Sequence, residues 1–322
     1  MKKQLFLGIE GGATRTTGVL ADAALRVVAR FEGRATNHYA RGWPEARAAL
    51  TEVLAELLSA AGVRQDSLAA SALCLAGVRS EPEALRWREI AESLHIPQPL
   101  LITHDAAAGL AAGSADVTGI LAVCGTGSLV YARRADGAEK FVGGRGPLLG
   151  DEGSGFDIGH RALRAAARSA DGRGPKSLLE TLIPERLRLD GLDALVAWAS
   201  PFAKDRVAGL APVVFEAAQG GDAAADAIIA GAVAELARGI EVAARALWPP
   251  PEAVGRIVLS GGVLRGQPTM RDALAAAARA FAPGALCGLA EAEGALGAAR
   301  LAQRAGRMRH TKHCSQRKET QR

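Results

Sequence analysis

The chain has 322 residues and a mass of 33.2 kDa, with 49% apolar and 23% charged residues, which excludes wholesale disorder and suggests about two domains. A net charge of +5 and a pI of about 9.3 invite a nucleic-acid-binding or membrane-binding interpretation. That interpretation fails because residues 305–322 hold six basic residues and one acidic residue, so the rest of the chain is neutral. We therefore predict a disordered basic tail at 305–322, no nucleic-acid partner and no membrane partner.

The cysteines and the apolar runs indicate where the protein works. The four cysteines are far apart and form no C-x-x-C pair, which is typical of a reduced protein, so we expect a cytoplasmic location. The first apolar stretch ends at Glu10, which is too short for a secretory signal. The longest uncharged run, 117–132, is shorter than a membrane span.

Strand and helix patterns alternate in two blocks. In the first block, apolar runs predict short strands, and helical spacing predicts helices that begin at Pro44 and Pro82. The second block begins near Gly119 and is mostly helical over 156–248. The predicted strands are 4–9, 18–20, 27–31, 71–78, 100–103, 120–124, 129–132, 254–259 and 285–289, and the last predicted helices are 268–281 and 293–304. Each block opens with a strand that runs into a Gly/Thr turn, which indicates two similar α/β domains.

Three glycine-rich turns follow three predicted strands. They lie at residues 8–16, 125–128 and 259–263, and the chain has no Walker A, Rossmann, G-x-S-x-G or H-E-x-x-H motif. Glycine lets the backbone approach a phosphate closely, and hydroxyl and amide groups donate to its oxygens. Each turn alone is also compatible with a tight hairpin or a capped helix start. Three of them in this order favour a phosphate-binding site.

Several polar residues next to these turns are candidates for chemistry. Glu10 ends the first strand and could hold Mg²⁺, directly or through water. Asp105 follows a strand, where it could cap a helix or orient a substrate hydroxyl as a general base. The segment Gly150–Gly155 presents Asp151 and Glu152 between small residues, as in a ligand site or an acidic helix start. Asn37 and His38 could bind a polar ligand or form a structural turn.

The order of these segments resembles a known family. It runs GIEGGAT at 8–14, TNH at 36–38, THDAA at 103–107, GTGS at 125–128 and GDEGS at 150–154. This order resembles that of N-acetylglucosamine kinases and, more broadly, of the BadF/BadG/BcrA/BcrD-type ATPase family. The resemblance covers nearly all of residues 4–304. It implies an α/β fold of two ribonuclease-H-like (actin-like ATPase) domains with an interdomain cleft.

The resemblance also implies domain boundaries. The N-terminal domain would comprise residues 1–115 and be completed by the C-terminal helix 290–304. The second domain, with a helical insertion, would comprise residues 116–289. The basic tail 305–322 would lie outside both domains. Related kinases often dimerise, so a homodimer is compatible with the resemblance.

The resemblance assigns roles to residues of the cleft. Asp105 would be the catalytic base, and ATP with Mg²⁺ would bind the glycine turns. The expected ATP-binding residues are Gly11, Gly12, Thr14, Gly125, Thr126, Gly127, Gly221, Gly261 and Gly262, and the expected metal-binding residues are Glu10 and Asp151. The expected sugar-binding residues are Asn37, His38, Asp105, Ser128, Gly144, Arg145 and Asp151.

The sequence departs from the family at Arg145, where many members have a tryptophan. Tryptophan would stack on an apolar sugar face, whereas arginine offers a charge and five donors. Arg145 could replace the stacking surface or pair with an acidic substituent of the sugar. We predict ATP-dependent phosphorylation of an amino sugar, N-acetylglucosamine to N-acetylglucosamine 6-phosphate. The alternatives are a glucosamine or N-acetylmuramic acid kinase and an iron–sulfur ATPase activator of the broader family.

Overall fold

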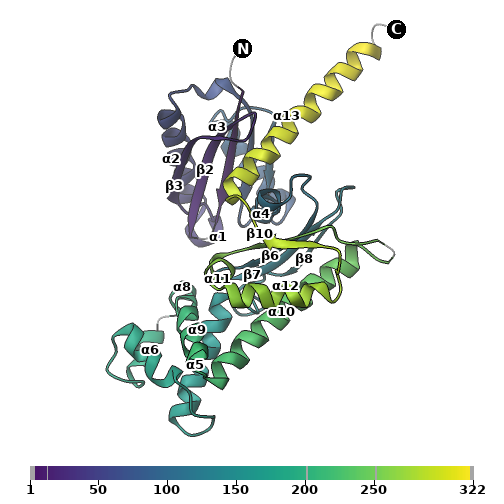
Figure 1. Ribbon diagram of the computed structural model, residues 1–322. Coiled ribbons are helices and arrows are strands. Elements are labelled where there is room, and N and C mark those ends of the chain that lie inside the picture. The colour runs from purple at the N-terminus through teal and green to yellow at the C-terminus, as the bar shows by residue number, and fades with distance from the viewer. Residues whose placement is uncertain (1–3, 13, 201, 251, 320–322) are drawn as a thin grey trace. The chain divides into compact units, whose positions relative to one another are not determined.

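The computed structural model describes residues 4–12, 14–200, 202–250 and 252–319, the last twelve of them as backbone alone. The chain divides into two compact units (Figure 1). The first comprises Met1–Val117 with Ala290–Arg322, and the second comprises Thr118–Leu289. The boundaries predicted from the sequence were 115/116 and 289/290.

The first unit is built on a five-stranded mixed sheet with the order β3-β2-β1-β4-β5. Strands β1 to β3 form an antiparallel meander, and β4 and β5 run parallel to β1. The glycine turn after β1 reverses the chain and starts the meander, as the sequence predicted. The strands are β1 (Leu5–Gly11), β2 (Arg15–Asp22), β3 (Val27–Arg34), β4 (Leu68–Leu75) and β5 (Leu100–Thr103).

Helices cover both faces of this sheet. On one face, α2 buries Leu50, Val53 and Leu57 at helical spacing, together with Trp87 of α3. On the other face, α4 and α13 pack through alanines such as Ala108. The helices are α1 (His38–Arg41), α2 (Trp43–Ala61), α3 (Glu81–Ser93), α4 (Asp105–Gly113) and α13 (Gly294–Glu319), with a short 3₁₀ turn at Gln65–Ser67.

The second unit repeats this arrangement. Its sheet has the order β10-β9-β6-β7-β8, again an antiparallel meander extended by two parallel strands. The strands are β6 (Gly119–Cys124), β7 (Ser128–Arg133), β8 (Glu139–Gly143), β9 (Arg256–Ser260) and β10 (Leu286–Leu289). The repeat confirms the predicted α/β class with two ribonuclease-H-like domains.

The second unit is mostly helical between β8 and β9, as predicted. Its largest core gathers the apolar faces of β6, α5, α9, α10 and α12. The helices are α5 (Gly155–Ala170), α6 (Leu179–Leu187), α7 (Ala194–Ala199), α8 (Lys204–Ala208), α9 (Ala211–Gln219), α10 (Ala223–Leu247), α11 (Gly262–Gly266) and α12 (Pro268–Arg279).

The prediction of a disordered tail at residues 305–322 is wrong for most of this segment. Helix α13 begins at Gly294 and continues to Glu319, so residues 305–319 are helical. After Gly306 this stretch contains neither glycine nor proline and is rich in Arg and Lys, which are good helix formers. Positive charge near a helix C-terminus is also favoured by the helix dipole.

Close backbone contact joins α13 to the rest of the first unit, and Figure 1 shows this helix against the sheet. A Cβ atom on Gly8 of β1 would lie 2.2 Å from the backbone nitrogen of Ala299. A Cβ atom on Gly297 would lie 2.0 Å from the carbonyl oxygen of Ala108 in α4. Only glycine permits such an approach. The sheet and the two helices are therefore in backbone contact.

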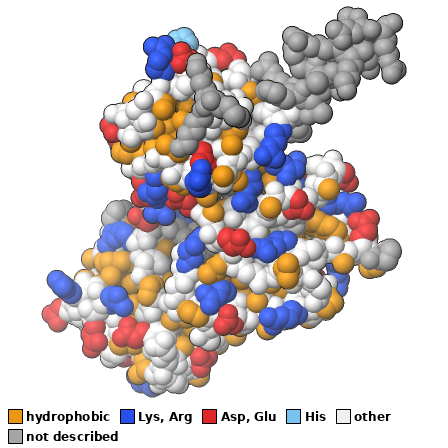
Figure 2. All heavy atoms as spheres, turned by 45° about the horizontal axis from the view of Figure 1, so that its top comes forward, with side chains coloured by type: hydrophobic (Ala, Val, Ile, Leu, Met, Phe, Trp, Pro, Cys, Tyr) orange, Lys and Arg blue, Asp and Glu red, His pale blue; other side chains and the backbone are white. Residues whose placement is uncertain are grey.

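The described surface carries mixed charge. Lys and Arg side chains are interspersed with Asp and Glu over the face that Figure 2 shows. Within the described residues, a helix with the length and apolar character needed to cross a bilayer is absent.

We expect Gly297→Ala to destabilise the protein by about 1–3 kcal/mol, because the added methyl group overlaps the backbone of α4. The matched control is Gly306→Ala on the same helix. Its Cβ would lie 3.5 Å from Ala70 Cβ, an ordinary contact, and alanine favours the helix. Urea unfolding of both variants measures the difference, and equal loss of stability in the two would contradict the packing.

Candidate functional site

In the first unit, candidate residues gather at one edge of the sheet. Strand register places Glu10 opposite Cys74 and Cys74 opposite Thr103, across three neighbouring parallel strands. Asp105 follows two residues after Thr103. In open α/β sheets, ligands bind at the carboxyl ends of parallel strands. The structure therefore brings Glu10 and Asp105 to the edge where a ligand is expected.

Glu10 lies against a glycine that the sequence analysis did not single out. A Cβ atom on Gly294, the first residue of α13, would lie between 2.1 and 2.5 Å from the carboxyl group of Glu10. The missing side chain therefore makes room for the carboxylate. A glycine at a helix start, 284 residues away in the sequence, gives no local sign of this role.

Asp105 is the first residue of α4, and the residue that caps the helix is His104. Nδ1 of His104 accepts a hydrogen bond from the Ala107 nitrogen at 3.1 Å. Asp105 Oδ1 accepts from the adjacent Ala106 nitrogen at 3.0 Å. The capping alternative for Asp105 is therefore wrong, because its neighbour fills that position and leaves its carboxylate for another role.

Desolvation raises the pKa of the Asp105 carboxyl above its ordinary value of 3.8. The electrostatic interaction with His104 and the hydrogen bond from the Ala106 nitrogen oppose this shift in the pKa of Asp105. A carboxylate in such surroundings is a stronger base than one in water. A perturbed carboxyl at the edge of a sheet is a candidate for proton chemistry.

The loop after β3 holds Asn37 and His38 by different means. Asn37 Oδ1 caps α1 by accepting from the Tyr39 nitrogen at 3.0 Å. His38 is buried, and its ring stacks on Trp43 with the ring centres 4.0 Å apart. Burial lowers the pKa of His38, and its Nδ1 has no hydrogen-bond partner in the described part of the chain. His38 therefore combines a structural position with a neutral, uncommitted polar atom.

The first glycine turn packs against this loop. A Cβ atom on Gly11 would lie 2.0 Å from Oγ1 of Thr36, and Thr36 in turn accepts a hydrogen bond from Thr16 at 3.0 Å. The Gly12 nitrogen donates to the Arg15 oxygen at 2.8 Å, which closes the turn. Thr14 is exposed, and Ala13 lies outside the described residues. The turn therefore presents Thr14 to solvent.

In the second unit, two predicted segments form one assembly. Hydrogen bonds join the turn Gly125–Ser128 to the loop Gly150–Gly155. The Gly155 nitrogen donates to the Gly125 oxygen at 2.8 Å, and Ser128 Oγ donates to the Glu152 oxygen at 2.7 Å. Cys124 at the end of β6 also donates, through Sγ, to the Gly153 oxygen at 3.0 Å. The glycine turn and the Gly-Asp-Glu-Gly-Ser segment are thus held together.

The third glycine turn lies beside the second. A Cβ atom on Gly261 would be 2.2 Å from the Cys124 oxygen and 2.8 Å from the Gly125 nitrogen. Gly261 has a φ of +101°, which favours glycine. Gly262 begins α11 directly after it. The turns at 125–127 and 261–262, which are 136 residues apart in the sequence, therefore meet at the carboxyl ends of β6 and β9.

The loop after β8 adds the remaining sugar-site candidates of this unit. Gly144, with a φ of +67°, packs against Leu129 and the Ser128 oxygen. The loop then turns back, so that Gly150 contacts the backbone of Arg145. Arg145 itself is exposed. The structure thus brings Ser128, Gly144, Arg145 and Asp151 together.

Asp151 has a partner that sequence reasoning missed. Its side chain is 5% exposed, and Lys204 Nζ donates to Oδ2 at 2.6 Å. Both side chains lie against Gly127, since a Cβ atom there would be 2.8 Å from Nζ and 3.1 Å from Oδ2. A single lysine in a helical region 53 residues after Asp151 gives no signal of this contact.

Gly221 lies apart from the other candidates of the second unit. It precedes α10, whose cap Asp222 accepts from the Ala225 nitrogen at 2.9 Å. The candidate loop contacts the same helix further along, where Gly153 packs on Ala232. At 1.5 Å per residue, Gly221 is about 16 Å from this contact along α10. The separation is compatible with opposite ends of an extended ligand.

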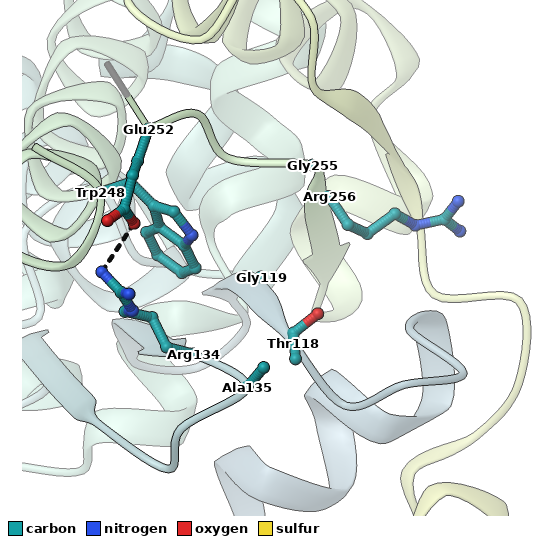
Figure 3. Close-up of a pocket in the computed structure, with 8 residues that line it drawn as sticks. All are labelled: Thr118, Gly119, Arg134, Ala135, Trp248, Glu252, Gly255 and Arg256. Carbon is teal, nitrogen blue, oxygen red and sulfur yellow. Dashed lines mark ion pairs between the residues drawn. The ribbon is translucent and has the colours of Figure 1, made fainter. Parts of the chain in front are cut away.

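Of the cavities of the second unit, one lies beside this region and another lies away from it. One of about 210 Å³ borders Ser128, Gly143 and Glu152 and extends to α10. The other, of about 180 Å³, lies where β6 and β9 begin, at the opposite end of these strands from the glycine turns. It contains the Arg134–Glu252 ion pair of 2.7 Å beside Trp248 (Figure 3). None of the predicted site residues lines this cavity of about 180 Å³.

The sequence matches the BadF/BadG/BcrA/BcrD ATPase family over residues 7–302. The chain belongs to this ATPase family. Two named relatives agree with the match. The N-acetyl-D-glucosamine kinase of Dictyostelium discoideum is 30% identical over 286 residues, which cover 85% of this chain and 90% of the relative. The N-acetylmuramic acid/N-acetylglucosamine kinase of Clostridium acetobutylicum is 31% identical over 232 residues, which cover 71% and 76%.

Solved structures agree with the family fold. A candidate N-acetylglucosamine kinase from Chromobacterium violaceum superposes with a TM-score of 0.72 at 27% identity, over 94% of this chain and 99% of that one. A ROK family glucokinase from Streptomyces griseus has a TM-score of 0.56 at 17% identity, over 93% and 99%, and shares the fold alone. The BadF/BadG/BcrA/BcrD match therefore agrees with both sequence and fold.

Because the pKa of Asp105 is raised, we expect the substitution Asp105→Asn to stabilise the protein at neutral pH. The native state holds the Asp105 proton more tightly than the unfolded state, so stability falls as pH rises from about 3.8 through the raised pKa. This loss of stability persists at higher pH. The Asn side chain is neutral at every pH, so the variant does not lose stability in this way. Thermal unfolding should show a higher midpoint for Asp105→Asn at pH 7 and a shrinking difference toward pH 4.

Asp22→Asn is the control variant, for which we expect a change in stability of the opposite sign. Hydrogen bonds from Arg26 lower the pKa of Asp22, so its charge stabilises the native state above pH 3.8 and that stability is lost as pH falls. This variant should have a lower midpoint at pH 7. A destabilised Asp105→Asn would show that the carboxylate is stabilised where it lies.

Proposed function

We propose that the protein is an ATP-dependent sugar kinase that phosphorylates an amino sugar, N-acetylglucosamine at its 6-hydroxyl. The observation that carries the proposal is the hydrogen-bonded assembly of Gly125–Ser128 with Gly150–Gly155. It joins a turn suited to phosphate with polar groups suited to a sugar. The names of the two relatives support the choice of substrate.

The nucleotide would supply the phosphoryl group, and the glycine turns have the form that a phosphate needs. Gly261 packs on the backbone of Cys124 and Gly125, where a side chain would fill the space. Backbone N–H groups in such turns stabilise phosphate charge. We assign Gly11, Gly12, Thr14, Gly125, Thr126 and Gly127 to the phosphates and Gly221, Gly261 and Gly262 to the adenosine end.

Asp105 would act on the acceptor hydroxyl. Phosphoryl transfer needs a carboxylate mainly to orient the attacking hydroxyl and to accept its proton late. The first residue of α4 is held by the helix and by its hydrogen bond from Ala106, which fixes the direction of the side chain. The raised pKa makes Asp105 a suitable acceptor.

Mg²⁺ would enter with the nucleotide rather than occupy a site built by protein side chains. Among the described residues, no group of three or more His, Cys, Asp and Glu side chains could hold a metal ion. Mg²⁺ usually keeps several waters and binds one or two carboxylates together with substrate phosphates. Glu10, in its glycine-made space at the end of β1, suits this role. Mg²⁺ would neutralise phosphate charge.

The candidate residues for sugar binding in each unit carry polar groups that suit the acceptor. Asn37 has an amide nitrogen that no described hydrogen bond uses, and it lies beside His38 in the loop after β3. Ser128, Gly144 and Asp151 are neighbours in the second unit. We propose that these residues hydrogen-bond the sugar, since amide, hydroxyl and carboxylate groups match its hydroxyl and acetamido groups.

Asp105→Asn is expected to lower the rate of sugar phosphorylation by about 100-fold or more, because the amide cannot accept the proton. Nucleotide binding should remain, since the residue is not assigned to ATP. An ADP-release assay with N-acetylglucosamine measures the rate. The matched control is Asp66→Asn, an exposed carboxylate paired with Arg64, which should leave the rate unchanged. Near-normal turnover of Asp105→Asn would overturn the assignment.

A broader acceptor range is the second candidate function. Arg145 is exposed in the loop that links Gly144 to Asp151, and the Clostridium relative is named for N-acetylmuramic acid as well as N-acetylglucosamine. N-acetylmuramic acid carries a carboxylate, which a guanidinium can bind in a bidentate manner. Arg145 would then pair with the acidic substituent.

Arg145→Ala separates the two roles of the arginine. If Arg145 pairs with the acid, the KM for N-acetylmuramic acid should rise about 10-fold or more, while the KM for N-acetylglucosamine changes little. Steady-state kinetics with both sugars measure the ratio. Arg161→Ala, at an ion pair with Asp157 in the same unit, is a control for the loss of an arginine. An equal effect on both sugars would show that Arg145 serves only as a surface.

The burial of Cys74 and Cys124 argues against an iron–sulfur cluster held by these two residues. Cys74 and Cys124 are buried in different units, and burial raises the pKa of each thiol, to about 12 for Cys124. A cluster held between subunits needs accessible thiolates. Buried thiols also suit the reducing cytoplasm that we propose as the location. Dimerisation stays a prediction.

A further inference from the structure

The contact between Lys204 and Asp151 is the feature that the proposed reaction leaves unexplained. The Asp151 side chain is 5% exposed, whereas Lys204 is 32% exposed. Lys204 is the first residue of α8, and its side chain meets Asp151 and the turn at Gly127. An ammonium group is therefore located where the glycine turn and the Gly-Asp-Glu-Gly-Ser loop meet.

The ammonium group has donors to spare. A lysine carries three N–H donors, and among the described residues the hydrogen bond of Nζ goes to Asp151 Oδ2. The side chain is partly exposed, so the other donors are open to a ligand. A lysine beside a glycine turn is a recurring phosphate-binding arrangement, in which the ammonium acts as a point charge.

We propose that Lys204 binds a terminal phosphate of the nucleotide at the turn Gly125–Gly127 while Asp151 holds its ammonium group in place. The inference rests on the proposed function, because it takes the turn as the phosphate site. The position of Nζ carries it, since a Cβ atom on Gly127 would lie 2.8 Å away. A glycine at 127 leaves the space that the lysine and a phosphate oxygen need.

The contact with Lys204 also argues against the predicted role of Asp151 in metal binding. An ammonium group 2.6 Å from Oδ2 already compensates the charge of the carboxylate. A divalent cation placed there would face the lysine, and like charges repel. Asp151 therefore serves the sugar and Lys204, and Glu10 remains the candidate for metal binding.

Nucleotide binding without sugar tests the proposal. Calorimetric titration of the full chain with ATP, ADP and AMP, each with Mg²⁺, measures the three dissociation constants. Lys204→Met should weaken ATP binding about 10- to 100-fold, since a charge-assisted hydrogen bond is lost. AMP binding should change less than about twofold, because AMP lacks the terminal phosphates. Lys204→Arg should retain part of the preference for ATP, since it keeps the charge.

Three further variants separate this role from a structural one. Lys204→Met leaves Asp151 buried without its partner, so the double variant Lys204→Met/Asp151→Asn removes both charges and should lose the same ATP affinity. Asp151→Asn alone keeps the ammonium group but loses the carboxylate that holds it, so it should weaken ATP binding less than Lys204→Met does. The matched control is Lys176→Met, at the exposed Lys176–Glu180 pair of the same unit, which should leave all three constants unchanged.

The outcomes distinguish the two proposals. If the unaltered chain binds ATP and Lys204→Met binds it equally well, the role of Lys204 is overturned and the kinase proposal stands. Equal loss of ATP and AMP affinity in the double variant would reduce Lys204 to a structural partner. If the unaltered chain binds none of the nucleotides, the proposed function fails and the role of Lys204 fails with it.

Discussion

Close contact between backbones, made possible by glycine, is the constraint on which both units depend. In the first unit Gly8 and Gly297 let α13 touch β1 and α4, and in the second Gly261 touches the end of β6. A side chain at any of these positions would overlap main-chain atoms. Since backbones of packed elements can shift little, these contacts fix where the strand ends and the glycine turns lie.

The candidate sites are built at these contacts. Gly294 makes the space for Glu10, and Gly127 makes the space for Lys204 and Asp151. A carboxylate removed from water is costly unless it is paired or free to shift its pKa, and the buried Asp151 and the half-buried Asp105 differ in this respect. Asp151 is compensated by an ammonium group, whereas the pKa of Asp105 is raised by desolvation. The first arrangement suits a residue that binds, and the second suits one that accepts a proton.

The elements that sequence patterns predicted well are those with strong local signals. Apolar runs that end in glycine gave β1, β6 and β9 with their turns, and helical spacing from Pro44 gave α2. The tail was predicted poorly because its positive charge was taken as a sign of disorder. Its Arg and Lys residues also favour a helix, and this local preference was the stronger one. The capping of α4 by His104 was missed because Asp at the next position is the more usual cap.

The sequence by itself determined the α/β class, the family and the segments that hold the candidate residues, because motifs and periodicity are local properties of a chain. Only the tertiary structure decided which of these segments meet within each unit. It brought Lys204 into contact with Asp151, Gly294 into contact with Glu10, and Gly261 into contact with the turn at Gly125. Each of these pairs is separated by more than fifty residues, and the contact follows from strand order and helix packing, which no short stretch of sequence encodes.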